Sequence, residues 1–289
     1  MGKVNQPGIS PLAEMVITPG GPRLKSNVHL IESGYHVQTI KGTLHKVHTA
    51  TGQSIQLLGK MNLRTNSRMS LRNLSAKETS GPKSGGWIVY SGWMNAAGSP
   101  INYFSTDWIV PPPPSTKNGQ LIYLFNGIED ANYQVILQPV LQWGVSPAGG
   151  GNYWAIANWY VGGPGSGLGL HSSLVPVNPG DRLKGMMTLT AQSGSAFDYQ
   201  SAFEGYSNDL SVRAVGELAW ANETLECYNL KAFTDYPAAG FIQLNNIELQ
   251  TGGAQANLAW TPYAPVQDNG QRCDVMSNNS PGGEVDLYY

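Results

Sequence analysis

The chain of 289 residues is long enough for one large β-domain with an accessory segment, or for two domains. Charged residues make up 12% of it, against a usual share of about 25%. It contains 35 Gly, 19 Pro, 8 Trp and 14 Tyr, a composition that favours turns and aromatic strands over helices. Its two cysteines exclude a disulfide scaffold and a cysteine-based zinc site.

The N-terminus lacks the apolar segment of a signal peptide, and no stretch of 18 apolar residues occurs. The sequence therefore predicts no membrane partner and leaves the localisation open.

Charge is distributed unevenly along the chain. Residues 1–80 contain ten Lys/Arg and three Asp/Glu, a net +7, whereas residues 81–289 contain seven and sixteen, a net −9. Opposite charges attract, so we expect the N-terminal part to dock on the acidic part. A basic arm for nucleic acid is the alternative, but the basic residues are scattered and lack clustered aromatics, so we expect no nucleic-acid partner.

In chain order, residues 1 to 26 are rich in Gly and Pro and predict irregular structure. From His29 to Leu63, short alternating runs separated by glycine-containing turns predict a small β-meander. Residues 64–86 are polar and basic and indicate a linker. We therefore divide the chain into a basic N-terminal segment, residues 1–80, and a β-domain, residues 81–289.

After Gly86 the pattern changes to nine or more strand candidates punctuated by turn sequences, which is typical of a β-sandwich. The candidates include GWIVYSGWM, INYFSTDWIV, QLIYLFNGI, QVILQPVLQWG, NYWAIANWYV, DRLKGMMTLTA, FDYQSAFEGY, ETLECYNL and GFIQLNNIEL. The best helix candidate, GELAWANETLEC, also alternates as a strand in its second half, so its periodicity leaves both structures open.

Metal and nucleophile motifs are missing from the sequence. The HKVH pair, His45 and His48, would point to opposite faces of a strand, which suits no metal. No Gly-x-Ser-x-Gly elbow, phosphate-binding loop or His-Glu-x-x-His occurs. We expect no metal and no other cofactor.

Polar residues inside apolar strands are the remaining candidates for chemistry. Gln138 lies in such a run, and Pro139 after it indicates a sheet edge or a bulge that aims the amide into a cleft. Gln142 would share its face. Glu226 lies between apolar residues, while Glu223, three residues away, would point to the opposite face. Each of these side chains has an ordinary structural alternative.

The order STDWIVPPPP, LFNGIED, VILQ, NYWAIANWY, VNPGDRLKGMM and ANETLECY resembles the glutamic peptidase (eqolisin) family over about residues 87–250. The resemblance implies an all-β fold, a sandwich of two bent antiparallel sheets like a concanavalin-type jelly roll, here with a small N-terminal β-rich extension. It places the catalytic glutamine on Gln138 and the catalytic glutamate on Glu226, five residues after Ala221, and brings both into a concave cleft. Residues implied to contact the substrate are Trp93, Glu129, Asp130, Trp154, Asn158, Trp159 and Tyr160.

The family has a Trp-Tyr-Glu-Trp strand where this chain has Ile156-Ala157-Asn158-Trp159, so a carboxylate of the cleft is replaced by an amide. Family members are made with basic prosegments, which suggests the same role for residues 1–80. The alternative is that this segment is a β-extension that completes the domain.

The resemblance implies an endopeptidase that acts on peptides or proteins, at acidic pH, through a water molecule held by Gln138 and activated by Glu226. Two alternatives stay open: a lectin-like carbohydrate-binding sandwich without catalysis, and a degenerate peptidase fold that acts on a small molecule.

Overall fold

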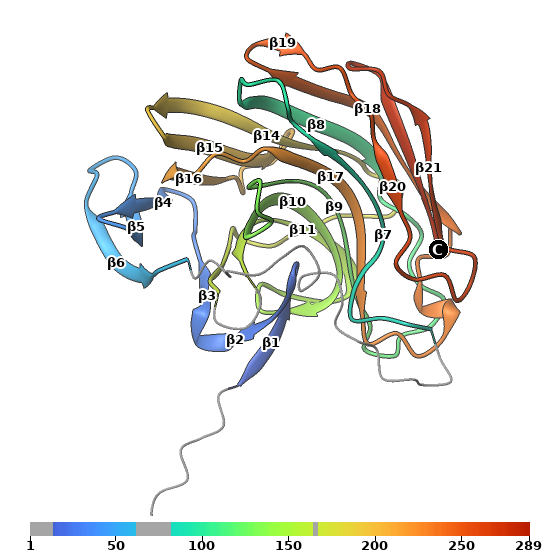
Figure 1. The fold of residues 1–289 in the computed structure, drawn as a ribbon. Helices are drawn as coiled ribbons and strands as arrows, with labels where there is room; N and C mark the ends of the chain where they lie inside the picture. The colour runs from blue at the N-terminus through green and yellow to red at the C-terminus, as the bar shows by residue number, and fades with distance from the viewer. Residues whose placement is uncertain (1–13, 62–81, 164–166) are drawn as a thin grey trace, which may run out of the picture.

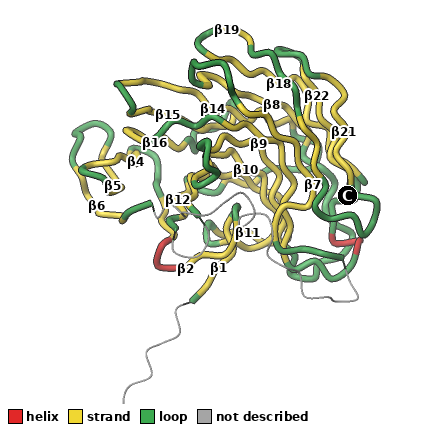
Figure 2. The backbone as a smooth tube through the Cα atoms, in the orientation of Figure 1, coloured by secondary structure: helices red, strands yellow, loops and turns green. Residues whose placement is uncertain are grey.

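The computed structural model describes residues 14–61, 82–163 and 167–289, almost entirely as β-strands (Figures 1 and 2). Two single-turn 3-10 helices, Lys25–Asn27 and Phe233–Asp235, are the helical structure of these ranges. No helix within them has the length and apolar character needed to span a membrane. The predicted all-β sandwich is confirmed.

A nine-stranded sheet carries five of the nine strand candidates that follow Gly86. In spatial order its strands are β20 (Thr261–Tyr263), β7 (Gly86–Met94), β17 (Trp220–Tyr228), β9 (Leu121–Glu129), β10 (Val135–Ser146), β11 (Gly149–Gly162), β12 (Gly169–His171) and β3 (Val28–Leu30), with β13 (Val175–Pro176) also paired to β11. The helix candidate at residues 216–227 forms mainly strand β17, which lies between β7 and β9 and is buried along its whole length.

An eleven-stranded sheet packs against the first. Its strands, in order, are β21 (Arg272–Ser277), β22 (Gly283–Tyr288), β18 (Phe241–Thr251), β8 (Ile101–Ile109), β14 (Arg182–Ser193), β15 (Ala196–Phe203), β16 (Leu210–Val215), β4 (Tyr35–Ile40), β5 (Thr43–His48) and β6 (Ser54–Gly59), with β19 (Ala254–Gln255) paired to β18. Neighbouring strands of the two sheets are antiparallel except for β12–β3 and β16–β4, which are parallel.

The N-terminal strands join both sheets. Strand β3 extends the nine-stranded sheet, and the predicted meander, β4 to β6, extends the eleven-stranded sheet through β16. Residues 15–24, predicted to be irregular, instead form a hairpin of β1 (Met15–Thr18) and β2 (Gly21–Leu24). Most of the predicted linker, residues 64–86, lies outside the described residues.

The nine-stranded sheet is apolar on both faces. One face contributes to the main core between the sheets, with residues such as Leu124, Leu137 and Leu225. The opposite face carries a second, aromatic cluster that includes Trp87, Tyr123, Phe125, Trp159 and Trp220. This second face, which we call the groove face, curves around the β1–β2 hairpin (Figure 1).

Candidate functional site

Strand register orders the polar side chains of the groove face into two rows that run across the sheet. Gln142 on β10 is opposite Tyr123 on β9, and Tyr123 is opposite Glu226 on β17; we call these three the Glu226 row. Further along the same strands, Gly127 on β9 is opposite Asn222 on β17. Gln138 falls opposite Gly127, because the neighbouring pairs Leu137–Ile128 and Val140–Phe125 keep one register. Gln138, Gly127 and Asn222 form the Gln138 row.

The register does not bring Gln138 and Glu226 together, although both lie on the groove face. Their rows are separated by four residues along the strands, 142 − 138 = 4 and 226 − 222 = 4. At about 3.3 Å per residue and about 4.8 Å per strand, the two backbone positions are about 16 Å apart. The register therefore gives no support to a water molecule shared by these two side chains, since the residue across Gly127 from Gln138 is Asn222.

The Glu226 carboxyl is fully buried and densely hydrogen-bonded. Tyr228, two residues on and on the same face, donates its hydroxyl proton to Oε1. The backbone N–H of Gly20 donates to both carboxyl oxygens, at N···O distances of 3.0 and 2.9 Å. Burial raises the pKa of Glu226 from 4.5 to about 7, against the opposing effects of these donors, of Arg23 and of Trp87. A carboxyl with a pKa near neutrality can both accept and return a proton.

The partner of Glu226 comes from the β1–β2 hairpin, which lies across the groove face. Its turn presents the N–H of Gly20, whose φ of +83° suits glycine. On one side of the turn, the Tyr123 hydroxyl donates to the carbonyl of Ile17 at 3.2 Å. On the other side, the buried Arg23 guanidinium donates to the carbonyl of Gly162 on β11 and to the Thr18 hydroxyl. The hairpin therefore reaches from β17 to β11.

The amide of Gln138 is buried without a hydrogen-bond partner. Its side chain is 0% exposed, and neither Oε1 nor Nε2 has a partner among the described residues. An unsatisfied buried amide costs about 1–3 kcal/mol. Gln142, by contrast, donates to the carbonyls of Gly144 and Gly149 and accepts from Ser146, so it holds the β10–β11 turn.

Two of the seven predicted substrate contacts belong to the groove face. Trp159 is opposite Gln138 on β11 and packs on His171, with ring centroids 4.8 Å apart. Glu129 is buried on β9, and its Oε1 accepts from Asn222 at 3.4 Å.

The other five predicted contacts lie elsewhere, which corrects the prediction. Trp93, Trp154 and Tyr160 pack in the core between the sheets, because their positions in the alternation point them away from the groove. Asn158 also points there, donating to the Asn208 carbonyl and accepting from Ser201. Asp130 accepts from the backbone of the 132–135 turn.

Pro139 is neither at a sheet edge nor at a bulge, in contrast to the prediction. Strand β10 lies between β9 and β11, and its register with β9 is regular on both sides of the proline. The missing N–H falls where the β9–β10 pairing skips from Leu137 to Val140. The proline ring packs against the opposite sheet at Gly185, where an added Cβ would lie 2.8 Å from Pro139 Cγ.

Glu223 points to the core side of β17, as its spacing from Glu226 predicts. It is fully buried, accepts a hydrogen bond from Thr106 on the opposite sheet, and burial raises its pKa well above the ordinary value. Glu223 therefore lies on the core side of β17 and has no access to the groove.

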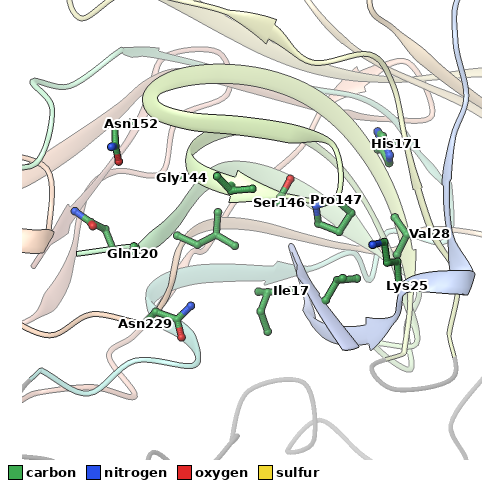
Figure 3. A pocket seen from close by; sticks show the side chains of 14 residues that line it. Ile17, Lys25, Val28, Gln120, Gly144, Ser146, Pro147, Asn152, His171 and Asn229 are labelled. Carbon is green, nitrogen blue, oxygen red and sulfur yellow. The ribbon is translucent and has the colours of Figure 1, made fainter. Parts of the chain in front are cut away.

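A half-open cavity of about 700 Å³ continues the groove beyond the hairpin (Figure 3). Ile17 and Val28 form one wall, and the β10–β11 turn, with Ser146 and Pro147, forms another. His171 lies at one end, where its Nδ1 pairs with the Ser172 carbonyl at 2.9 Å and burial lowers its pKa. The lining is mixed, because Lys25 and Asn152 add a cation and an amide to the apolar side chains of Ile17 and Val28.

Among the residues that the structure describes, no three His, Cys, Asp or Glu side chains gather as possible metal ligands. Cys227 and Cys273 are both buried and free.

Four residues of the site were not among the sequence candidates: Gly20 and Arg23 of the hairpin, Tyr228 and Asn222. The sequence could have indicated Tyr228, because a residue two positions after Glu226 on a strand lies on the same face. The sequence could not have indicated Asn222, because its position across Gly127 from Gln138 depends on the register of three strands.

No protein-family model matches this sequence, and neither does any curated protein. Solved structures with a similar course of the chain include two of scytalido-glutamic peptidase, with a peptide-based transition-state analogue and with a transition-state analogue inhibitor. Each is 16% identical; the matches cover 70% of this chain and 98% and 97% of theirs, with TM-scores of 0.48 and 0.49. A third is SCP-B, of the eqolisin family, in complex with the tripeptide Ala-Ile-His, at 15% identity, 70% and 98% coverage and a TM-score of 0.46. The SCP-B structure is described as a member of the eqolisin family, the family whose motifs this sequence resembles.

Proposed function

We propose that the protein hydrolyses peptide bonds of a polypeptide bound on the groove face, with Glu226 as the acid–base group. One observation carries this proposal: the buried Glu226 carboxyl is bound to the backbone N–H of a polypeptide turn, at Gly20. The same row of side chains also binds a backbone carbonyl, since Tyr123 donates to Ile17. A site with these two contacts recognises the two polar groups of a peptide bond.

The proposed reaction uses groups of the Glu226 row. Ionised Glu226 takes a proton from water as the water oxygen bonds to the peptide carbonyl carbon. Tyr123, which donates to a carbonyl in the present structure, would donate to the developing oxyanion. Protonated Glu226 then gives its proton to the leaving amine as the C–N bond breaks. Tyr228 holds the carboxyl in position throughout.

The hairpin occupies this site, so the structure corresponds to a latent form of the proposed enzyme. A substrate reaches Glu226 only after Gly20 withdraws. Water would then enter and reduce the burial that raises the pKa of Glu226. The pKa of Glu226 would then fall, so the carboxylate would be present, and the proposed enzyme active, at acidic pH.

The test compares the wild-type chain with Gly20→Pro, which removes the N–H and the positive φ that the turn requires. Both are incubated from pH 3 to 8 with a fluorogenic peptide library and with casein. We expect Gly20→Pro to cleave faster than wild type, and Gly20→Pro combined with Glu226→Gln to lose about 10²- to 10⁴-fold in rate. Cleavage that is unchanged by Glu226→Gln overturns the proposal.

A second candidate, a polypeptide-binding protein without hydrolysis, is favoured by the Gln138 row. The residue opposite Gln138 is an amide, Asn222, so no carboxylate of that row can activate water. This candidate predicts that Gly20→Pro binds peptides and cleaves none at any pH.

A further inference from the structure

The Gln138 row has unused hydrogen-bonding capacity that the proposed reaction at Glu226 does not explain. Gln138 has two N–H donors and an acceptor oxygen, all buried and without partners among the described residues. Native proteins rarely bury such an amide without a reason. Because its strand lies in the centre of the sheet, this side chain is fixed in place on the groove face.

Asn222 adds a second carboxamide to the row, across Gly127 from Gln138. Gly127, between them, has no side chain, and the Asn222 carboxamide leans over it: a Cβ on Gly127 would lie 3.2 Å from Oδ1 and 3.3 Å from Nδ2. Thr224 donates to Asn222 Oδ1 at 2.9 Å, and Asn222 Nδ2 donates to Glu129 at 3.4 Å. These two bonds orient Asn222 and leave it one further N–H.

The chemistry of the row selects an uncharged ligand with both a donor and an acceptor. The carboxamides of Gln138 and Asn222 offer both donors and acceptors, and a carboxylate ligand would meet the acid of Glu129. In an extended peptide, the N–H and C=O of one residue point to the same side and match the C=O and NH₂ of one carboxamide. The groove already accommodates a polypeptide, because the hairpin crosses it from Glu226 to Gly162.

We propose that Gln138 and Asn222 form a backbone-binding site for an extended segment of polypeptide, separate from the Glu226 row by four residues along the strands. The hairpin makes no hydrogen bond to Gln138, so a peptide that binds the amide gains hydrogen bonds that the hairpin does not form. The inference rests on the proposed polypeptide substrate, and it assigns Gln138 a positioning role in place of a catalytic one.

The test uses Gln138→Met, which removes both polar groups at similar volume. If the amide is kept unsatisfied for a ligand, the substitution raises the Tm of the full chain by about 2–4 °C, because a buried orphan group is removed. An amide with a structural partner gives the opposite sign. Gln192→Met, at the exposed end of β14, is the matched control and leaves Tm unchanged.

Binding is measured in the Gly20→Pro, Glu226→Gln background, so that the groove is open and cleavage does not interfere. The probe is a fluorescein-labelled library of acetylated, amidated decapeptides, with a backbone N-methylated library as its counterpart. We expect Gln138→Met to weaken binding of the first library about ten- to hundredfold and to abolish the preference over the second. Asn222→Ala should weaken it in the same way.

Unchanged affinity in Gln138→Met, a lowered Tm, or binding of oligosaccharides in place of peptides overturns the inference. The outcome is distinguishable from failure of the proposed hydrolysis. If no variant cleaves peptides but Gln138→Met still loses binding, the backbone-binding site stands and hydrolysis at Glu226 does not. If cleavage depends on Glu226 while Gln138→Met leaves affinity and KM unchanged, hydrolysis stands and the backbone-binding site falls.

Discussion

Replacing Glu226 by glutamine should change how the stability of the protein depends on pH. The carboxyl is fully buried, and burial raises its pKa from 4.5 to about 7 in the folded state. Between these two values the folded protein holds a proton that the unfolded chain has lost. Unfolding therefore releases a proton, and the free energy of unfolding falls as the pH rises from 4.5 to 7.

The magnitude follows from the width of this window. Each pH unit contributes about 1.4 kcal/mol, so the interval from 4.5 to about 7 amounts to about 3 kcal/mol. Below pH 4.5 both states are protonated and above pH 7 both are ionised, so the contribution is constant outside the window. A carboxamide cannot ionise, and the Glu226→Gln variant therefore lacks this term at every pH.

The assay is urea unfolding followed by tryptophan fluorescence at pH values from 4.5 to 8. We expect the difference in free energy of unfolding between Glu226→Gln and wild type to shift by about 3 kcal/mol in favour of the variant across this range. Subtraction of the two proteins removes the contribution of Glu223 and other buried acids. Glu217→Gln, on the surface, is the control. Parallel pH profiles of Glu226→Gln and wild type would refute the proposed burial of an ionisable carboxyl under the hairpin.

Three further substitutions test other parts of the structure. Gly185→Ala should lower the free energy of unfolding in urea by about 1–3 kcal/mol. The added Cβ would lie 2.6 Å from the Asn126 amide oxygen and 2.8 Å from Pro139 and from Trp108. Gly216→Ala is the control and should leave stability unchanged, because the space around Gly216 is open. Tyr228→Phe removes a donor to the Glu226 carboxyl and should raise its pKa in the folded state, so the upper limit of the pH window moves upward in the same urea assay. Gly20→Pro should expose the buried Arg23 and speed tryptic cleavage after it, read by mass spectrometry; an unchanged cleavage rate would show that the turn does not hold the hairpin.

Alternation along the strands made much of the fold and part of the site predictable. Glu226 and Glu223 were expected on opposite faces, and the structure places one in the groove and the other in the core. Gln138 and Gln142 were expected on one face, and both lie on the groove face. These predictions depend only on the two-residue period of a strand, which the sequence displays directly.

Features that depend on which strands pair were beyond the sequence. Pro139 indicates an edge when read alone, yet β10 is central, because the missing N–H coincides with a gap in the pairing with β9. Trp154 and Tyr160 are as aromatic as Trp159, and only their alternation within β11 separates core residues from a groove residue. The hairpin of residues 15–24 was hidden by its own glycines and prolines, which are as common in tight turns as in irregular segments.

The distance between the two strongest candidates shows how much one register decides. Gln138 and Glu226 belong to strands separated only by β9, and shifting β17 by four residues would place a carboxylate opposite Gln138 without altering the composition of either face. In the actual register an amide takes that place and the carboxyl lies beside Tyr123. The two roles expected of a single pair are therefore assigned to two places on one sheet. The Glu226 row has the proton-transfer group, and the Gln138 row has the amides that match a peptide backbone.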